Sequence, residues 1–169
     1  QDFVRRGGAI INAEVRGFEI GGEGPTKILT DRGPVDVETV VLAAGVWSRP
    51  LAKQLGTSVP LEAERGYHVM LAGQDFGLRL ALVSADRNVS LAHMHEGIRA
   101  TGVAEFAAPD APPDMRIADM IARHAKELVA GLKGEPASKW MGPRPSHPDS
   151  KPVIGRSPRH LSFFEMLGN

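Results

Sequence analysis

The first 60 residues carry short segments that are rich in apolar and β-branched residues and that are separated by glycine. Such segments are typical of strands, and we predict strands at 9–15, 26–30 and 35–44. The tripeptide Asp31-Arg32-Gly33 separates the second segment from the third and has the turn chemistry of a β-hairpin. A polar segment before them, which ends at the Gly7-Gly8 pair, is predicted to be the last turn of a helix.

The third segment ends in a continuous apolar run at 40–44, which is followed by Gly45. A continuous run suits a strand that is buried on both faces, as in a parallel sheet between helices. A short helix is predicted over 49–55, with Ser48 as its N-cap and Gly56 just after its end. This part of the chain therefore reads as one buried strand–turn–helix unit.

From residue 60 to residue 106 the pattern changes to strand-like segments divided by turn residues. The turn signals lie at 73–75, 86–88 and 96–97, and they predict an antiparallel meander. A proline-rich loop follows, and Asp114 is the expected N-cap of the most regular helical pattern in the chain. The apolar stripe of that helix consists of Ile117, Met120, Ile121, His124, Leu128 and Leu132. Further short strands are predicted around Trp140-Met141 and at 160–164.

These elements predict an α+β fold, in which an antiparallel or mixed sheet with covering helices accompanies the strand–turn–helix unit. The alternative is the middle of an α/β protein whose antiparallel domain is inserted between parts of a parallel sheet. We divide the chain at 1–58, 59–142 and 143–169. The first residue is Gln1 and not methionine, and it lies within a predicted helical turn, so we expect a piece of a longer protein.

Composition excludes several classes of function. The 20 basic and 20 acidic residues cancel, and no basic run marks a nucleic-acid surface. The chain has no cysteine, which excludes disulfides, thiolate catalysis and cysteine metal sites. The longest apolar run, 40–47, is too short to span a bilayer, and the first residues are not typical of a signal peptide. His93 and His95 share one face of a predicted strand, but a metal site needs a third ligand, so we predict none.

Arg144 is the side chain with the most distinctive surroundings. Prolines at 143 and 145 fix the backbone dihedrals on both sides of it. A preorganised arginine presents a planar fork that matches a carboxylate or a phosphate. In a desolvated site, such a bidentate contact contributes roughly 1.5–3 kcal/mol. The alternative is an internal salt bridge, for example with Asp149, and spacing alone does not decide between the two.

Other candidates have simple structural explanations. Tyr67, the only tyrosine, could hydrogen-bond a substrate or anchor a sheet, and the sequence slightly favours the anchor. His124 lies on the apolar stripe of the long helix and suits a hydrogen-bonded histidine at its boundary. Gly45 after a buried strand would let a ligand approach the backbone, but a well-packed strand end explains it better.

Four segments in order resemble the superfamily of FAD-dependent D-amino-acid oxidases and dehydrogenases, which includes glycine oxidase. They are VVLAAGVWSRPLAKQLG, PLEAERGYHVML, IRATGVAEF and WMGPRPSHPDSKPVIGRSP. ERGYH and GPRP are most similar to bacterial D-amino-acid dehydrogenases, including those that act on imino acids related to hydroxyproline. The resemblance covers nearly the whole chain. It implies that 1–58 belongs to the FAD-binding domain, that 59–142 is the antiparallel substrate-binding domain, and that 143–169 returns, incompletely, to the FAD domain.

The resemblance also implies roles for single residues. Arg144 matches the arginine that binds the substrate carboxylate in front of the flavin, and Tyr67 would line the same pocket. Cofactor contacts are implied for Val15, Ala44, Gly45, Trp47, Ile154 and Gly155. The implied reaction passes the α-hydrogen of a D-amino or imino acid to FAD as a hydride, and hydrolysis then gives the keto acid. The flavin carries the difficult step, and Arg144 positions the substrate.

The implied partner is an amino-acid substrate, in a cytoplasmic protein that is free or peripherally attached to the inner membrane. Oxygen and a membrane quinone both stay open as electron acceptors. The chain lacks the G-x-G-x-x-G fingerprint and the C-terminal flavin loop of relatives, and His147 and Ser150 replace their common Thr and Gly. We therefore expect this chain alone to hold no FAD and to be inactive. The alternatives are a stand-alone module that binds small carboxylates and an inactive remnant.

Overall fold

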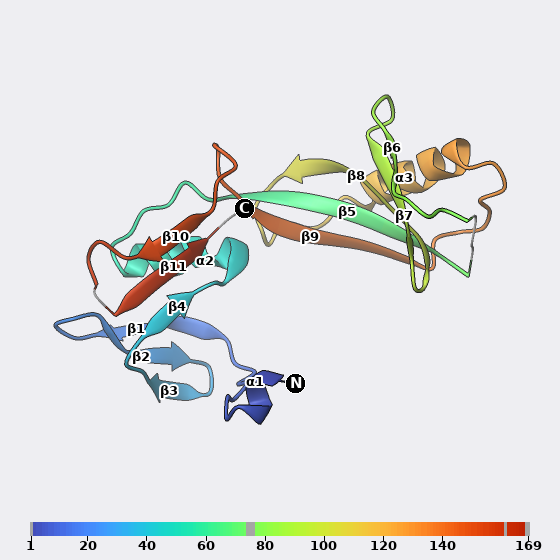
Figure 1. Cartoon of the computed structure of the whole chain (residues 1–169). Coiled ribbons are helices and arrows are strands. Elements are labelled where there is room, and N and C mark those ends of the chain that lie inside the picture. Colours follow the sequence, from blue (N-terminus) through green and yellow to red (C-terminus); the bar gives the residue numbers. More distant parts are fainter. Residues whose placement is uncertain (1, 74–76, 161, 168–169) are drawn as a thin grey trace. The chain divides into compact units, whose positions relative to one another are not determined.

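The computed structural model describes residues 2–73, 77–160 and 162–167, and Figure 1 labels their helices and strands. The chain forms two compact units. Unit 1 consists of Gln1–Leu61 with His147–Asn169, and unit 2 consists of Glu62–Ser146. Residues 143–146, which we had grouped with the C-terminal part, thus belong to unit 2, and residues 59–61 belong to unit 1.

Unit 1 begins with the short helix α1 (Asp2–Arg5) and a three-stranded antiparallel sheet of β1 (Val15–Ile20), β2 (Pro25–Thr30) and β3 (Gly33–Asp36). The predicted hairpin turn joins β2 to β3, where the Thr30 hydroxyl donates to the Gly33 carbonyl over 2.6 Å. The strand predicted at 9–15 is wrong, because only Val15 joins the sheet. Ile10 is 80% exposed, and an apolar segment without a neighbouring strand to pair with does not become a strand.

The predicted strand at 35–44 is divided between two sheets. Its second half is β4 (Val40–Leu42), which pairs in parallel with β11 (Phe163–Leu167), and β11 pairs in antiparallel with β10 (Val153–Arg156). The parallel pairing was expected, but burial on both faces was not correct. Val40 and Leu42 are buried and Val41 between them is 57% exposed, so only one face of β4 is covered.

The strand–turn–helix unit continues through the 3-10 turn η1 (Gly45–Trp47) into α2 (Ser48–Gln54). Ser48 does not cap α2 as predicted. It is the first helical residue, and its hydroxyl instead accepts the N–H of Ala44 over 3.0 Å, because η1 leads directly into the helix. Gly56 follows the helix with φ +76°, as a C-terminal glycine should. The core of unit 1 is formed by Val40, Leu42, Leu51, Ala52, Leu55, Val59, Leu61, Phe163 and Leu167.

Unit 2 is a five-stranded antiparallel sheet with the order β6-β7-β8-β5-β9. Its strands are β5 (Glu62–Ala72), β6 (Leu82–Ser84), β7 (Val89–Met94), β8 (Gly97–Phe106) and β9 (Ser138–Ser146). The predicted meander holds for β6, β7 and β8, whereas β5 lies between β8 and β9 and not beside β6. The turn predicted at 73–75 lies largely outside the described residues.

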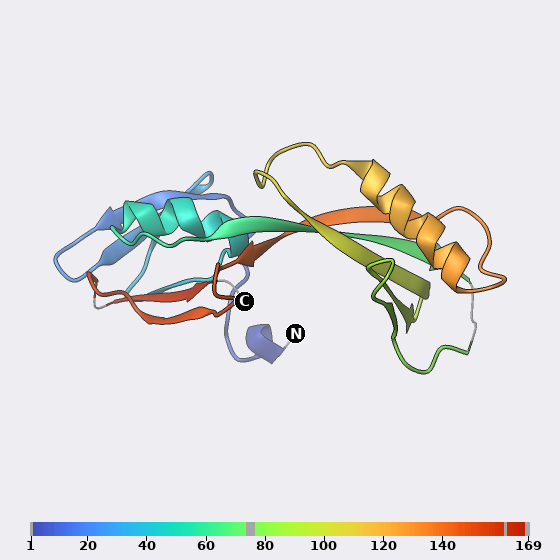
Figure 2. The same cartoon turned by 90° about the horizontal axis from the view of Figure 1, so that it is seen from above.

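One face of this sheet is covered by α3 (Met115–Leu128), as Figure 2 shows. Asp114 caps the helix as predicted, since its side chain accepts the N–H of Arg116 over 3.1 Å. The helix ends before the predicted stripe does, because Val129 is extended and Leu132 reaches the same core from the following loop. Among the described residues, no helix combines the length and apolar character needed to cross a membrane.

Candidate functional site

Arg144 lies on the face of the unit 2 sheet that is opposite to α3. It stands on β9 directly across from Glu64 on β5. Because side chains alternate along a strand, Pro143 and Pro145 point to the other face. The prolines thus support the strand from the helix side, and the guanidinium is presented on the open side.

The guanidinium of Arg144 lies over Gly66. A Cβ atom built on Gly66 would be 2.7 Å from Nη2 and 2.9 Å from Cζ, so a larger residue would displace the arginine. The side chain is 54% exposed, and its Nη1 is 3.7 Å from Oε1 of Glu64. The other oxygen of Glu64 accepts the Ser146 hydroxyl over 2.7 Å. Arg144 is therefore loosely paired and reachable from solvent.

The acid that lies near Arg144 is not the one named from the sequence. The neighbouring acid is Glu64, whereas Asp149 accepts the backbone N–H of Lys151 over 3.2 Å. At 3.7 Å the contact with Glu64 is an ion pair at the long end of the range, between two partly exposed side chains. Such pairs contribute about 0–1 kcal/mol, so a substrate carboxylate can compete for the guanidinium.

Two aromatic side chains continue the same face beside Arg144. The ring of Trp140 lies over Gly142, and it stacks on His68 with 4.9 Å between the ring centroids. Burial, with the nearby charge of Arg99 as a smaller cause, lowers the pKa of His68 below its ordinary value. At neutral pH the imidazole is therefore uncharged, which suits a ring that is stacked on an indole.

Tyr67 points to the opposite face, into the core under α3. Its hydroxyl donates to Glu105 over 2.6 Å and accepts the N–H of Asp114 over 3.0 Å. The buried Arg65 approaches the same hydroxyl and forms an ion pair with Glu105 at 3.4 Å. Burial, and next the bond to Glu105, raise the pKa of Tyr67. This arrangement favours the anchoring role, and a substrate contact by Tyr67 stays a prediction.

Three of the residues expected to contact a cofactor meet in one cleft of unit 1. Val15, Ala44 and Trp47 line a space of about 860 Å³, together with Ala13, Glu14, Arg16, Pro50, Leu51 and Gln54. Gly45 adjoins it with φ +58°, and a Cβ built there would have no atom within 4 Å, so the backbone is open to a close approach. The lining combines apolar side chains and one indole with the polar side chains of Glu14, Arg16 and Gln54, so it offers a ring system both apolar contact and hydrogen-bonding groups.

The other two expected cofactor residues lie elsewhere in unit 1. Ile154 and Gly155 are on β10, where Ile154 is 68% exposed and the space around Gly155 is open. They do not line the cleft that holds Val15. Their contact with a cofactor stays a prediction.

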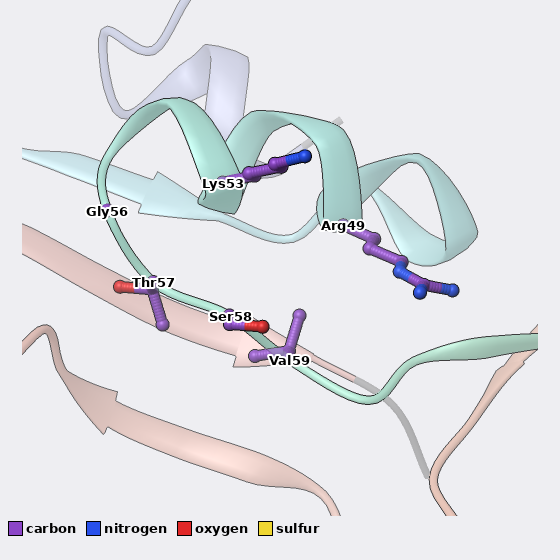
Figure 3. A pocket seen from close by; sticks show the side chains of 6 residues that line it. All are labelled: Arg49, Lys53, Gly56, Thr57, Ser58 and Val59. Carbon is purple, nitrogen blue, oxygen red and sulfur yellow. The ribbon is translucent and has the colours of Figure 1, made fainter.

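A second, smaller cavity of unit 1 lies at the end of α2 and has a volume of about 280 Å³ (Figure 3). It is lined by Arg49, Lys53, Gly56, Thr57, Ser58 and Val59. The guanidinium of Arg49 donates to the carbonyl of Leu61 over 3.1 Å, which ties the helix to the chain that follows it. No motif in the sequence pointed to this cavity.

Sequence reasoning also missed Glu64, Gly66, His68 and Trp140. The alternation along β5 puts Glu64, Gly66 and His68 on one face, and this signal was readable. Which face of which strand they would share with Arg144 depends on the β5–β9 register, which the sequence does not reveal.

The sequence profile of the family described as DAO, FAD dependent oxidoreductase, matches residues 1–168. A D-amino-acid oxidase of Bradyrhizobium diazoefficiens is 32% identical over 155 residues, which cover 89% of this chain and 37% of that protein. A glycine oxidase of Pseudomonas aeruginosa is 31% identical over 147 residues, which cover 86% of this chain and 40% of the relative.

Solved structures share the fold. Glycine oxidase from Geobacillus kaustophilus superposes with a TM-score of 0.81 at 21% identity, over 92% of this chain and 42% of that one. L-proline dehydrogenase from P. horikoshii gives a TM-score of 0.77 at 21% identity, over 92% and 44% of the two chains. The chain thus spans well under half the length of these similar proteins.

Proposed function

This chain belongs to the DAO family of FAD-dependent oxidoreductases, and on that premise we propose that it is the substrate-binding part of an enzyme that oxidises D-amino or imino acids. Arg144 binds the substrate carboxylate. The observation that carries the proposal is the seat of its guanidinium, which lies flat over Gly66, half exposed, with only a loose contact to Glu64.

The chain's own residues bind and orient the substrate. Two parallel N–H···O bonds from Arg144 would fix the carboxylate plane, and the strand geometry of β9 would fix the arginine. Glu64, whose other oxygen accepts the Ser146 hydroxyl, is a weak partner of the guanidinium that the substrate carboxylate can displace. Val15, Ala44, Gly45 and Trp47 would hold part of the cofactor, and contacts from Ile154 and Gly155 are retained in the proposal. FAD, when bound, supplies the acceptor for the hydride from the substrate's α-carbon.

The test begins with a protein in which this chain is completed by the flanking residues of its reading frame. We expect it to bind flavin and to oxidise members of a panel of D-amino acids, glycine, sarcosine and proline derivatives. Reduction of oxygen and of a quinone analogue should be followed in parallel, because relatives named D-amino acid dehydrogenase occur beside the oxidases. A flavin-containing protein that oxidises nothing in the panel contradicts the proposal.

Arg144→Ala should lower kcat/KM roughly 10- to 150-fold, because it removes a charge-assisted contact of about 1.5–3 kcal/mol. Arg123→Ala, on the exposed side of α3, is the matched control and should leave kcat/KM unchanged.

Gly66→Ala should act in the same direction as Arg144→Ala, since its methyl group would displace the guanidinium from its position over the strand. Gly22→Ala, where a Cβ meets nothing within 4 Å, controls for the added methyl. If the protein takes up no flavin but binds acetate through Arg144, it is a carboxylate-binding module.

A further inference from the structure

Two neighbouring glycines on the open face of the unit 2 sheet are each covered by a planar side chain. Gly66 lies under the guanidinium of Arg144, and Gly142 lies under the indole of Trp140, whose Cζ3 would be 2.7 Å from an added Cβ. Gly66 and Gly142 are directly opposite each other in the β5–β9 pair. Directly opposed residues of an antiparallel pair are about 4.5–5.5 Å apart, so the two planes lie side by side.

The strand register explains why no bulky side chain stands at this point of the sheet. Ala104 on β8 is opposite Gly66, so the row formed by Gly142, Gly66 and Ala104 contains no side chain larger than a methyl group. The row on one side of it carries Arg144 and Glu64, and the row on the other side carries Trp140 and His68. This row of small residues therefore gives the guanidinium and the indole room to lie on the sheet.

Trp140 is held in place and is nevertheless accessible. Its ring rests on Gly142 and stacks on His68 at an interplanar angle of 29°, yet the residue is 54% exposed. An indole that only filled the core would be buried under α3 with Tyr67 and Val69. Instead, the exposed part of the indole lies on the same side of the sheet as Arg144.

We propose that Trp140, backed by His68, is the subsite for the side chain of the substrate, and that it selects aromatic and large apolar amino acids. This inference rests on the proposed function of Arg144. A carboxylate on the guanidinium leaves the substrate's side chain only a few bonds from the indole, where an aromatic ring can stack in an offset arrangement. Such contacts favour an aromatic over a methyl side chain by roughly 3- to 10-fold.

The test is a comparison of substrates in the completed, flavin-loaded protein. Trp140→Ala should lower kcat/KM for D-phenylalanine roughly 3- to 10-fold relative to D-alanine, whereas Trp140→Phe should keep most of the preference. Gly142→Ala, which would lift the indole from its seat, should act like Trp140→Ala, with Gly22→Ala as the control. An equal loss for both substrates, or no loss for either, overturns the subsite. A wild-type protein that oxidises neither substrate counts against the proposed function instead.

Binding without turnover gives an independent measurement. This chain has 2 tryptophans, so in the chain without added flanking residues Trp47→Phe leaves Trp140 as the only indole, and its fluorescence reports on the subsite. Phenylacetate should change this emission and bind roughly 3- to 10-fold more tightly than acetate. Arg144→Ala should weaken both ligands. Equal affinity for the two acids, or no change in Trp140 emission on binding, overturns the inference even if Arg144 is confirmed as the carboxylate ligand.

Discussion

The family resemblance puts Arg144 and Tyr67 in one pocket, but the structure places them on opposite faces of the sheet. Gly66 lies under Arg144 on the open face, and the next residue, Tyr67, is 1% exposed on the face covered by α3. There it joins Arg65 and Glu105 in a hydrogen-bonded cluster. At the residue scale, strand alternation therefore decides whether a polar group faces the open side of the sheet or the core under α3.

Tyr67→Phe tests this division. The change removes a hydroxyl that serves both Glu105 and the N–H of Asp114, so we expect unfolding in urea to cost about 1–3 kcal/mol less than in the wild type. The KM for the amino acid should change less than about twofold if the role is structural. If Tyr67→Phe is as stable as the wild type but has a much higher KM, Tyr67 contacts the substrate and the structural role is wrong.

The lowered pKa of His68 makes the stability of the protein depend on pH. Its pKa is lowered from 6.5 in the folded state, chiefly by burial, so below pH 6.5 the unfolded chain binds a proton that the folded chain does not. Stability should be fully present above about pH 6.5 and should fall as the pH drops toward the folded pKa. Urea unfolding at pH 7.5 and pH 5 should show a smaller difference in His68→Gln than in the wild type. The same difference in both proteins would refute the assignment.

At the element scale, the proline-containing segment around Arg144 forms β9, the edge strand of its sheet. Pro143 and Pro145 are opposite Arg65 and Ala63 of β5, and β9 is the last strand of its sheet. Proline donates no hydrogen bond to a ladder, so it is tolerated at an edge, where it also discourages pairing with another chain. The prolines therefore hold Arg144 within a regular strand and not within a loop.

Local elements were predictable and their partners were not. The cap at Asp114, the β2–β3 hairpin and the glycine after α2 depend on neighbouring residues, and each was expected from the sequence. The parallel pairing of β4 with β11 and the position of β5 beside β9 join segments far apart in the chain, and their register was not readable. The candidate site follows the same rule, since Arg144 was singled out by its motif whereas its position over Gly66 was not predicted.

Replacing both prolines of β9 by alanine measures their contribution. Each proline restricts the unfolded chain, so the double variant Pro143→Ala, Pro145→Ala should lose about 1–2 kcal/mol of stability in total. Carboxylate affinity should fall as well, because Arg144 loses part of its preorganisation. Urea unfolding and acetate titration check the two effects. Unchanged values for both would mean that the strand pairing alone holds the arginine.

At the scale of the whole molecule, the two proposed binding roles fall in different units. The cleft with Val15, Ala44 and Trp47 belongs to unit 1, and Arg144 with Trp140 belongs to unit 2. Unit 1 is built from both ends of the chain, because β11 must pair with β4. Each unit has its own apolar core, so damage to one should not spread evenly to the other.

Phe163→Ala in unit 1 and Ile121→Ala in unit 2 form a matched pair, since both side chains are 0% exposed. Truncating a buried side chain of this size costs about 2–5 kcal/mol. Native-state hydrogen exchange should show faster exchange at Leu42 in the first variant and at Val69 in the second, with little change in the other unit. If either variant speeds exchange equally in both units, the chain unfolds as one cooperative body. In that case any variant that weakens the cofactor cleft would also loosen the seat of Arg144, and losses of substrate affinity would have to be corrected for stability before they are assigned to contact.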